Sequence, residues 1–414
     1  MSRAFVLAGV AFVCGLSCAH TEPSIETATQ AARVLRWVGT TPMGAPRSML
    51  PAAVELRDHR VLVAGGDVNA AGPTAEVYDP SKETWTATGP MASFHISASA
   101  VRLPDGRVLV VGGQACNPEP LGGCNGVLPF AQPEIYDPKT NAWTATSVPP
   151  SMLETHGAAL LGDGTVLVAG GVSYANGDFE PTAQVYDPKS DAWTLTAAVP
   201  STGGAGELVA LQDGRALLVG GLRFFVNGPV SAEAWAYDAR SATWSAAGTL
   251  ATARWEASAI TLADGRVLVT SGQDAASNIL LSAELFDPRT NTWTSAGSMG
   301  RPHLLGPMAN LGNGLVVMSG GLAVDVPFLA TTELFDAKSG SWSAGPDMLR
   351  PRADHAAVAV PNNRILAVGG WTGTCTPNVI EGGLGGEGGA DPDAGATCTA
   401  AATAEAEVLG LGRP

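Results

Sequence analysis

Apolar and polar positions follow one pattern that recurs along the chain about every 50 residues. Each copy has a partly apolar segment that ends in a turn, then a continuous apolar run that ends in two glycines. A variable loop follows, then a short segment that ends in an aromatic residue and an aspartate, and last a segment with a tryptophan. Short apolar segments bounded by glycine, proline and aspartate predict strands, and we name the four strands of one copy a to d.

Three markers identify seven copies of this pattern. The glycine pairs are Gly65-Gly66, Gly112-Gly113, Gly170-Gly171, Gly220-Gly221, Gly320-Gly321 and Gly369-Gly370, with Ser271-Gly272 as a degenerate copy. The aromatic-aspartate pairs are Tyr78-Asp79, Tyr136-Asp137, Tyr186-Asp187, Tyr237-Asp238, Phe286-Asp287 and Phe335-Asp336, and the last copy has Val408-Leu409 instead. The tryptophans are Trp37, Trp85, Trp143, Trp193, Trp244, Trp293 and Trp342.

Short polar turns join strands a and b. Asp105-Gly106, Asp163-Gly164, Asp213-Gly214, Asp264-Gly265 and Asn313-Gly314 are the strongest of these turns, and Asp58-His59 and Asn362-Asn363 are weaker versions. Such pairs favour a two-residue type I′ hairpin, in which both residues have positive φ. We therefore predict an a–b hairpin in every copy.

This set of markers resembles the Kelch repeat from about residue 35 to the C-terminus. The resemblance implies an all-β, seven-bladed Kelch-type β-propeller with four-stranded antiparallel blades, over residues 35–414. Trp37 marks a strand d that no strand a, b or c precedes, and the last copy, from about Arg352 to Leu409, has no tryptophan after it. We predict that the N-terminal strand completes the last blade and closes the ring, which removes two free sheet edges.

Residues 1–18 predict an export signal. Arg3 gives a positive start, and the apolar run from Ala4 to Leu16 is too short to span a bilayer. The stretch Gly15-Leu16-Ser17-Cys18 resembles a bacterial lipobox, which implies lipidation at Cys18. Gly15 replaces the usual bulky aliphatic residue, so ordinary cleavage after Ala19 stays open. Residues 19–34 then form a linker, and we expect the protein at the cell envelope, in the periplasm or outside the cell.

The remaining cysteines form two local pairs. Cys116 and Cys124 flank one b–c loop, and Cys375 and Cys398 flank another, which is rich in glycine. In an exported protein this spacing predicts two local disulfides. Neither pair has the close spacing or the nearby histidines of a zinc site, so we expect no metal and no cofactor.

Composition narrows the possible partners. A formal net charge of -15 repels phosphate backbones, so we expect no nucleic acid as partner, while cationic ligands remain compatible. Hydrophobic residues at 45% supply ample material for a core. No later segment is long and apolar enough to span a membrane, so a lipid on Cys18 is the one membrane contact we expect, and we expect a monomer.

The b–c and d–a loops lie on the same face of a propeller because successive strands alternate in direction. The b–c loops vary most, so this face is the expected binding face. At the start of strand a, four copies carry a basic or imidazole group: His95, Arg254, His303 and Arg352. Ser48, Leu153 and Gly203 hold this place in the other copies. A basic ring at the channel mouth predicts a site for an anion or carboxylate, although polar residues that line a wet channel give the same pattern.

Two tryptophans and two acids lie near this mouth outside the repeat markers. Trp255 and Glu256 follow Arg254 in a d–a loop, Asp354 follows Arg352, and Trp371 follows a glycine pair. Exposed aromatic faces stack on sugar rings or anchor a protein partner, and they also pack their own loops.

Three functions are compatible with these features. The first is a non-catalytic binding or scaffold module for an unknown protein or glycan at the cell envelope, because no nucleophile elbow, zinc motif or nucleotide loop is present. The second is a sugar-modifying enzyme like the Kelch-type sialic acid mutarotase, with Arg254, Glu256, Arg352 and Asp354 as site residues. The third is a copper oxidoreductase like galactose oxidase, but the repeat already uses four of the five tyrosines. We expect the first.

Overall fold

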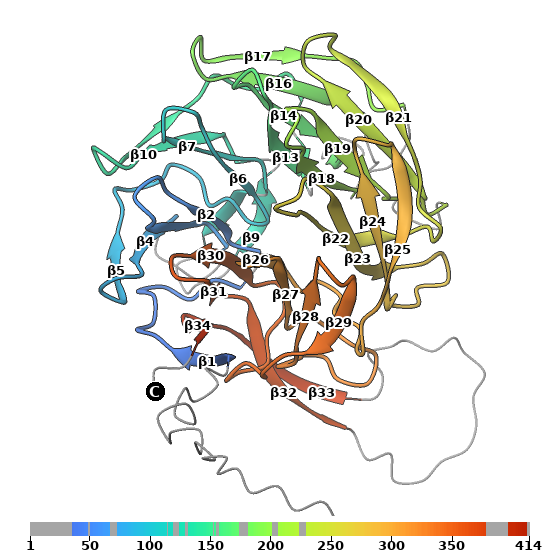
Figure 1. Cartoon of the computed structure of the whole chain (residues 1–414). Coiled ribbons are helices and arrows are strands. Elements are labelled where there is room, and N and C mark those ends of the chain that lie inside the picture. The colour runs from blue at the N-terminus through green and yellow to red at the C-terminus, as the bar shows by residue number, and fades with distance from the viewer. Residues whose placement is uncertain are drawn as a thin grey trace, which may run out of the picture.

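Seven four-stranded antiparallel sheets surround a central axis in this protein, as the computed structural model shows (Figure 1). The structure describes residues 35–48, 50–66, 73–113, 115–118, 124–128, 131–151, 153–154, 157–173, 181–200, 206–222, 229–377 and 396–411. Each sheet is one blade, with strand a innermost and strand d outermost. The predicted seven-bladed propeller is confirmed.

Six blades are built from consecutive strands in the order a to d. Blade 1 has β2 (Ala52–Glu55), β3 (Val61–Ala64), β4 (Ala75–Asp79) and β5 (Thr84–Ala87). Blade 2 has β6 (Ser99–Arg102), β7 (Val108–Val111), β10 (Glu134–Asp137) and β11 (Ala142–Ala145). Blade 3 has β13 (Gly157–Leu160), β14 (Val166–Ala169), β16 (Ala183–Asp187) and β17 (Ala192–Leu195). Blade 4 has β18 (Glu207–Ala210), β19 (Ala216–Val219), β20 (Glu233–Asp238) and β21 (Thr243–Thr249). Blade 5 has β22 (Trp255–Thr261), β23 (Val267–Gln273), β24 (Ser282–Asp287) and β25 (Thr292–Ser298). Blade 6 has β26 (Met308–Gly312), β27 (Leu315–Ser319), β28 (Thr332–Asp336) and β29 (Ser341–Ala344).

The seventh blade joins the two ends of the described chain. It has β30 (Ala356–Val360), β31 (Arg364–Val368) and β34 (Ala406–Leu411), and its outer strand is β1 (Leu35–Gly39). Trp37 lies opposite Leu409 in the antiparallel pairing of β1 with β34. The N-terminal strand therefore closes the ring, as predicted.

Three further strand pairs lie in the loops of blades 2, 3 and 7; two lie within a b–c loop, and the one in blade 3 joins its d–a connection to its b–c loop. They are β8 (Ala115–Pro118) with β9 (Cys124–Leu128), β12 (Leu153–Glu154) with β15 (Val172–Ser173), and β32 (Trp371–Pro377) with β33 (Ala396–Ala402). Within the described ranges, no helical segment has the length and apolar character needed to cross a bilayer.

The core consists of seven hydrophobic clusters, one between each pair of neighbouring blades. The strand b runs supply the largest share of it: Val61, Leu62, Val63 and Ala64 of β3 are all fully buried. A continuous apolar run suits strand b because both of its faces are covered. The repeat tryptophans link blades as well, since the Trp85 indole N–H donates to Thr41 O at 2.8 Å across the closing interface.

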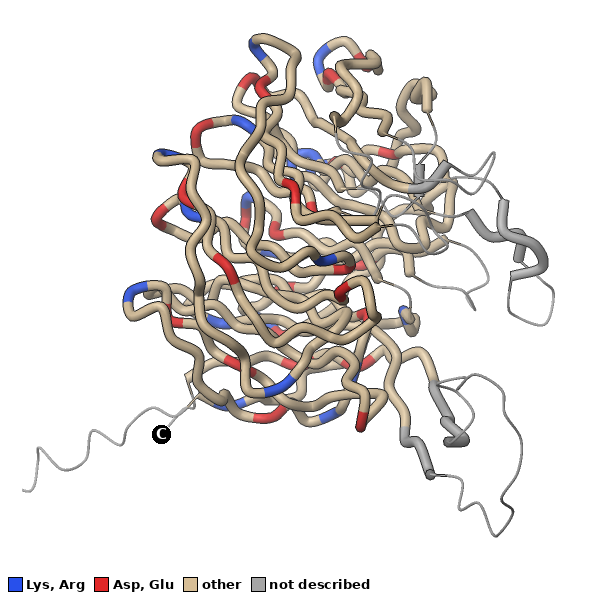
Figure 2. The backbone as a smooth tube through the Cα atoms, turned by 90° about the vertical axis from the view of Figure 1, so that its right-hand side faces the viewer, with Lys and Arg blue, Asp and Glu red and all other residues tan. Residues whose placement is uncertain are grey.

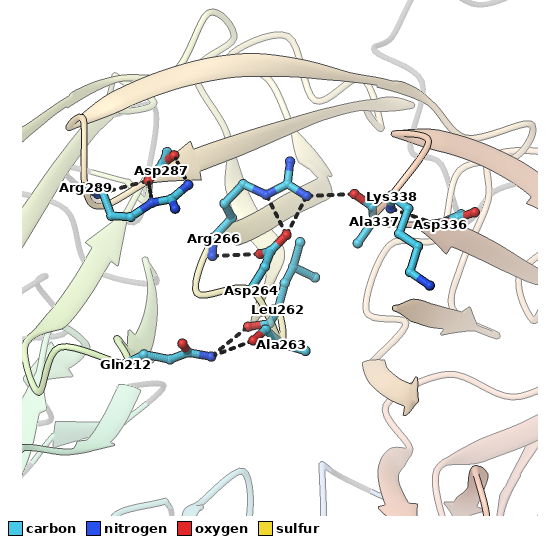
Figure 3. Close-up of polar contacts among 10 residues, drawn as sticks. All are labelled: Gln212, Leu262, Ala263, Asp264, Arg266, Asp287, Arg289, Asp336, Ala337 and Lys338. Carbon is cyan, nitrogen blue, oxygen red and sulfur yellow. Dashed lines mark hydrogen bonds and ion pairs between the residues drawn. The ribbon is translucent and has the colours of Figure 1, made fainter. Parts of the chain in front are cut away.

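The two faces of the disc differ in their connections. The turn face carries the a–b and c–d turns, and the loop face carries the b–c and d–a connections. On the turn face, Arg266 donates to Asp264 of its own turn at 2.7 Å and to Ala337 O of the next blade at 2.7 Å (Figure 3). Acidic and basic positions alternate along these turns at the left of Figure 2. Charge on this face is thus paired locally and also joins blades.

The type I′ prediction is wrong for the five aspartate turns. At Asp105-Gly106 only the glycine has positive φ, at 97°, and the Gly106 N–H donates to Leu103 O at 2.9 Å. This is a type I turn followed by a left-handed residue, which suits a longer hairpin loop. The Asp105 carboxylate accepts the Arg107 backbone N–H at 3.0 Å and stabilises that geometry. Both residues have positive φ only at Asn313-Gly314 and Asn362-Asn363.

A glycine pair ends strand b because the backbone of the loop face approaches it closely. Gly321 has φ of 99°, and a Cβ there would lie 2.6 Å from Leu304 O. Two hydrogen bonds fix this approach, because the Gly321 N–H donates to Arg352 O at 2.7 Å and the Leu322 N–H to Leu304 O at 2.7 Å. The glycines therefore allow the segment that precedes each strand a to lie against the end of a strand b.

Candidate functional site

The four basic residues predicted to ring the channel mouth are fully buried. His95, Arg254, His303 and Arg352 each have an exposed fraction of 0%. Each faces a glutamate on strand c of its own blade. The distances are 3.3 Å for His95–Glu134, 3.2 Å for Arg254–Glu284, 3.6 Å for His303–Glu333 and 2.6 Å for Arg352–Glu407. The prediction of an open basic ring is therefore wrong, because these side chains are used inside the blades.

The glutamates also hold the d–a loops. The Glu284 carboxylate accepts the backbone N–H groups of Ala251 at 2.7 Å and Thr252 at 3.2 Å. The same kind of hydrogen bond, from backbone N–H groups of a d–a loop, is accepted by Glu134, Glu333, Glu407 and, in blade 1, Glu76. We call the basic residue, the glutamate and these N–H groups the loop clamp. It pins each loop over strand c on the way to the channel.

Arg254 shows why the clamp needs a guanidinium or imidazole. Its Nη1 donates to Ser271 O at 3.0 Å and Ser282 O at 2.9 Å, and its Nη2 donates to Ser282 Oγ at 3.0 Å and to Glu284. Burial lowers the pKa of Arg254, and the charge of Glu284 opposes this effect. The side chain thus satisfies backbone carbonyls of strands b and c that would otherwise be buried without donors.

The clamp differs in blades 1, 3 and 4. In blade 1 the basic residue is Arg47, not Ser48, and Arg47 Nη2 lies 3.2 Å from Glu76 Oε1. In blade 3 the glutamate is replaced by Gln184, whose amide exchanges two hydrogen bonds with the Ser151 backbone. Blade 4 has Trp235 at this position. A glutamate two residues before the aromatic marker in four copies, and two residues before Leu409 in the last copy, was the sequence signal for the clamp.

The residues that do lie at the mouth have left-handed backbone. Two or three residues after the basic residue of each clamp, φ is positive at Leu50, Ser97, Glu256, Leu305 and Asp354. We call these five the rim residues. The Leu50 N–H donates to Asp354 O at 3.1 Å, and the Asp354 N–H to Leu305 O at 3.3 Å, so the rim is continuous across blades 6, 7 and 1. Left-handed backbone costs a leucine or glutamate about 1–2 kcal/mol, which the surrounding packing must offset.

Two rim residues are acids with perturbed titration. Burial raises the pKa of Asp354 to about 6. Burial also raises the pKa of Glu256, the Asp354 charge adds to this rise, and the hydrogen bond from Gln273 opposes it. The Gln273 amide donates to Glu256 Oε2 at 3.0 Å. The predicted site residues Glu256 and Asp354 are therefore close enough for their charges to interact, and they give the mouth acidic character instead of basic.

The predicted tryptophans flank these acids and are half-buried. Trp255 is the first residue of β22, not a loop residue, and it lies opposite Gln273. Trp371 opens β32, and its backbone N–H donates to Ala353 O at 2.9 Å, beside Asp354. Each tryptophan is thus fixed next to one rim acid through the backbone.

Glu207 is an acid that sequence reasoning missed. It is the first residue of β18, at the loop-face end of strand a in blade 4. Burial raises its pKa to about 7. An acid at the start of an otherwise apolar strand a was the available signal.

The cysteines are described only through the backbone or not at all. Cys375 and Cys398 are direct partners in the β32–β33 pairing, whereas Cys116 pairs with Val127 and Cys124 with Pro118. The two disulfides remain predictions. The export signal 1–18, Cys18 and the linker 19–34 lie outside the described residues.

Comparison with known proteins agrees with the architecture. Seven radial blades define the class of β-propellers. A model of the Kelch motif matches residues 258–300, within blade 5, and the same markers recur in the other blades. The chain is a Kelch-repeat β-propeller. No curated protein matches it by sequence.

Two solved structures share this fold. A fungal alcohol oxidase of the AA5 family, described in complex with copper, is 17% identical over 91% of this chain and 76% of its own, with a TM-score of 0.65. A protein described as YjhT is 16% identical over 74% of this chain and 99% of its own, with a TM-score of 0.56. At these identities the likeness is one of fold.

The described residues do not fit a copper site. They contain no group of three or more histidine, cysteine or acidic side chains placed to hold a metal ion. Tyr78, Tyr136, Tyr186 and Tyr237 are buried between blades, each with its ring centroid 4.8–5.2 Å from that of the repeat tryptophan. We therefore derive no chemistry through copper.

Proposed function

We propose that this protein is a non-catalytic binding module whose ligand site is the loop-face mouth of the central channel. The ligand group that fits is a cation, carried by a lysine- or arginine-bearing segment of a protein partner. The supporting observation is the sign of the charge at the mouth: the basic residues of the clamps are buried against glutamates, while Glu256 and Asp354 remain at the rim.

Three features support a cationic ligand. The formal net charge of -15 attracts cations over long distances. Two neighbouring carboxyl groups whose pKa values are raised gain from a nearby positive charge, because it favours their ionised forms. Trp255 and Trp371 are fixed beside the acids through the backbone, and a cation over an indole face contributes about 0.5–2 kcal/mol.

Affinity for such a ligand should depend on pH and salt. The ligand needs the carboxylate form, so affinity should rise as the pH passes about 6, the pKa of Asp354, and then level off. Screening should weaken binding as the ionic strength increases.

The test is a binding screen with the purified protein. A library of lysine- and arginine-bearing peptides and a glycan array are compared for the wild type, for the double variant Glu256→Gln/Asp354→Asn and for Asp325→Asn. Asp325 is the matched control, because it is an exposed acid on the same face, paired with Arg301 at 2.8 Å. Loss of basic-peptide binding in the double variant alone supports the proposal. Glycan binding without peptide binding, or equal binding by all three proteins, would contradict it.

A sugar-modifying enzyme is the second candidate. A carboxyl group with a pKa of about 6 exchanges protons readily near neutral pH, which suits general acid–base catalysis at Asp354. Arg254 and Arg352 no longer support this function, because they are buried in clamps. A mutarotation assay on sialic acid and neutral hexoses tests it, and a rate equal to the uncatalysed rate would exclude it for those sugars.

Localisation at the cell envelope through Cys18 is part of the binding-module proposal, and mass spectrometry of the mature N-terminus tests it.

A further inference from the structure

A cavity lies at the turn-face end of the channel, opposite the loop-face mouth. It has a volume of about 500 Å³, within the range of small-ligand sites. Glu55, Arg57, Arg102, Ala158, Leu160 and Ala210 line it. We call it the turn-face cavity, because Glu55, Arg102, Leu160 and Ala210 are the last residues of strand a in blades 1 to 4, next to the a–b turns.

One wall of this cavity is charged. Arg102 Nη1 donates to the Glu55 backbone oxygen at 2.8 Å and lies 3.9 Å from Glu55 Oε2. Within the described part of the chain this is the one hydrogen bond that the Arg102 guanidinium makes, and 39% of its side chain is exposed. Glu55 also contacts His59, whose Nδ1 lies 2.7 Å from Oε1. Arg102 therefore keeps unused donors beside a carboxylate that already has a second partner.

The charge of this wall favours a ligand with a single negative charge. Two guanidinium groups, Arg57 and Arg102, stand against one carboxylate, Glu55. The Arg57 guanidinium donates to Pro104 O, which holds it at the neighbouring turn. A monoanion neutralises the excess of one positive charge, whereas a dianion would leave one negative charge in the cavity uncompensated.

The other wall is apolar. Ala158, Leu160 and Ala210 come from blades 3 and 4 and carry no polar side-chain atoms. At the same position of strand a in blades 5 and 6, Thr261 donates to Ala210 O at 2.7 Å, and Asn310 donates to Thr261 O at 3.1 Å. Those two side chains link neighbouring strands, but they do not line the cavity. The ring of strand ends is therefore charged on one side, apolar on the next and polar on the third.

We propose that the turn-face cavity binds a small monocarboxylate with a short apolar substituent. The Arg102 guanidinium takes the carboxylate, since guanidinium groups pair with carboxylates in planar geometry. The apolar substituent lies against Ala158, Leu160 and Ala210, where it loses contact with water. This site is separate from the loop-face mouth and takes a ligand of opposite charge.

The test uses the purified full chain with butyrate as the probe and butyramide as its uncharged analogue. Isothermal titration calorimetry compares the wild type with Arg102→Gln and Thr261→Ala. Thr261→Ala is the matched control, because it removes the same kind of side-chain link at the same ring position outside the cavity. We expect butyrate to bind the wild type and Thr261→Ala equally, about tenfold more weakly to Arg102→Gln, and butyramide to bind far more weakly than butyrate.

Three results would overturn the proposal: no butyrate binding to the wild type at millimolar concentration, equal affinity in Arg102→Gln, or equal affinity for butyramide. If Arg102→Gln does not fold, as judged by circular dichroism, Arg57→Gln replaces it, with weaker butyrate binding expected and unchanged binding as the contrary result. Glu256→Gln/Asp354→Asn should keep its butyrate affinity, so failure at one end of the channel is distinguishable from failure at the other.

Discussion

Replacing Arg254 by Met should strongly destabilise the protein. Arg254 is fully buried and makes five hydrogen bonds, to Thr252 O, Ser271 O, Ser282 O, Ser282 Oγ and Glu284. Removing one partner of a buried ion pair costs about 3–5 kcal/mol, because the other charge stays buried. Glu284 would keep its two backbone donors, which places the expected loss near the lower end, at about 3 kcal/mol.

Urea denaturation followed by circular dichroism measures this loss as a change in the free energy of unfolding. The control is Arg289→Met, which removes an exposed arginine that pairs with Asp287 on the turn face, and we expect no measurable change from it (Figure 3). Equal stabilities of the two variants would refute the loop clamp and restore Arg254 as a candidate ligand residue.

A double variant tests the physical cause. Arg254→Met with Glu284→Gln removes both charges and resembles blade 3, where the Gln184 amide holds the Ser151 backbone. We expect it to be more stable than Arg254→Met alone, because no unpaired charge remains buried. If the second change destabilises the protein further, the buried charge is not the source of the loss.

Three other predictions follow from the fold. Gly321→Ala should destabilise the protein by several kcal/mol, because the new Cβ would overlap Leu304 O. Gly340→Ala is the control: φ is positive there too, but no atom lies within 4 Å, so it should cost only about 1–2 kcal/mol. Similar losses of stability for the two variants in thermal melts would contradict this reasoning. Asp354→Asn should increase the free energy of unfolding by about 1–2 kcal/mol more at pH 8 than at pH 4. The reason is that ionisation of a carboxyl group with a raised pKa opposes folding above about pH 6, and solvent screens part of this cost. Urea titrations of the wild type and the variant at both pH values check the sign. Deleting residues 35–39 should abolish cooperative unfolding, because β34 would lose its partner strand, and a sharp transition in calorimetry would be the contrary result.

The repeat made the fold predictable from sequence. Each marker has one physical role that recurs. Val61 to Ala64 form a buried strand, Gly321 allows a close backbone approach, and Trp37 marks an outer strand that is far in sequence from the rest of its blade. The turn type was not predictable from Asp105-Gly106 alone, because the Asp105 carboxylate also stabilises a type I turn through the Arg107 N–H. The turn type also depends on the length of the hairpin loop, which is set by where the pairing of the flanking strands ends and not by the dipeptide.

The site was predictable only in part, because its charge depends on contacts between residues far apart in sequence. Arg352 looks like an open cation until Glu407, 55 residues later, is placed beside it. Glu256 and Asp354 were selected as candidates for acid–base catalysis together with Arg254 and Arg352. The electrostatic interaction between the two acids, which lie near the start of strand a in different blades, comes only from the geometry of the ring. The turn-face cavity was missed because its two walls come from four different blades.

The closing pair of strands also sets the order in which the protein can be completed. β1 is synthesised before any blade, but its partner β34 is the last strand of the propeller to be synthesised, so Trp37 cannot pair with Leu409 until then. Pairing over such a separation is slow, because most of the chain must become ordered before this contact forms. A chain that stops before β34 has six complete blades and a seventh that lacks one strand, so β31 and β1 each keep an open edge. Ring closure therefore acts as a test of completeness, since only a full-length chain hides both edges from other partly folded copies.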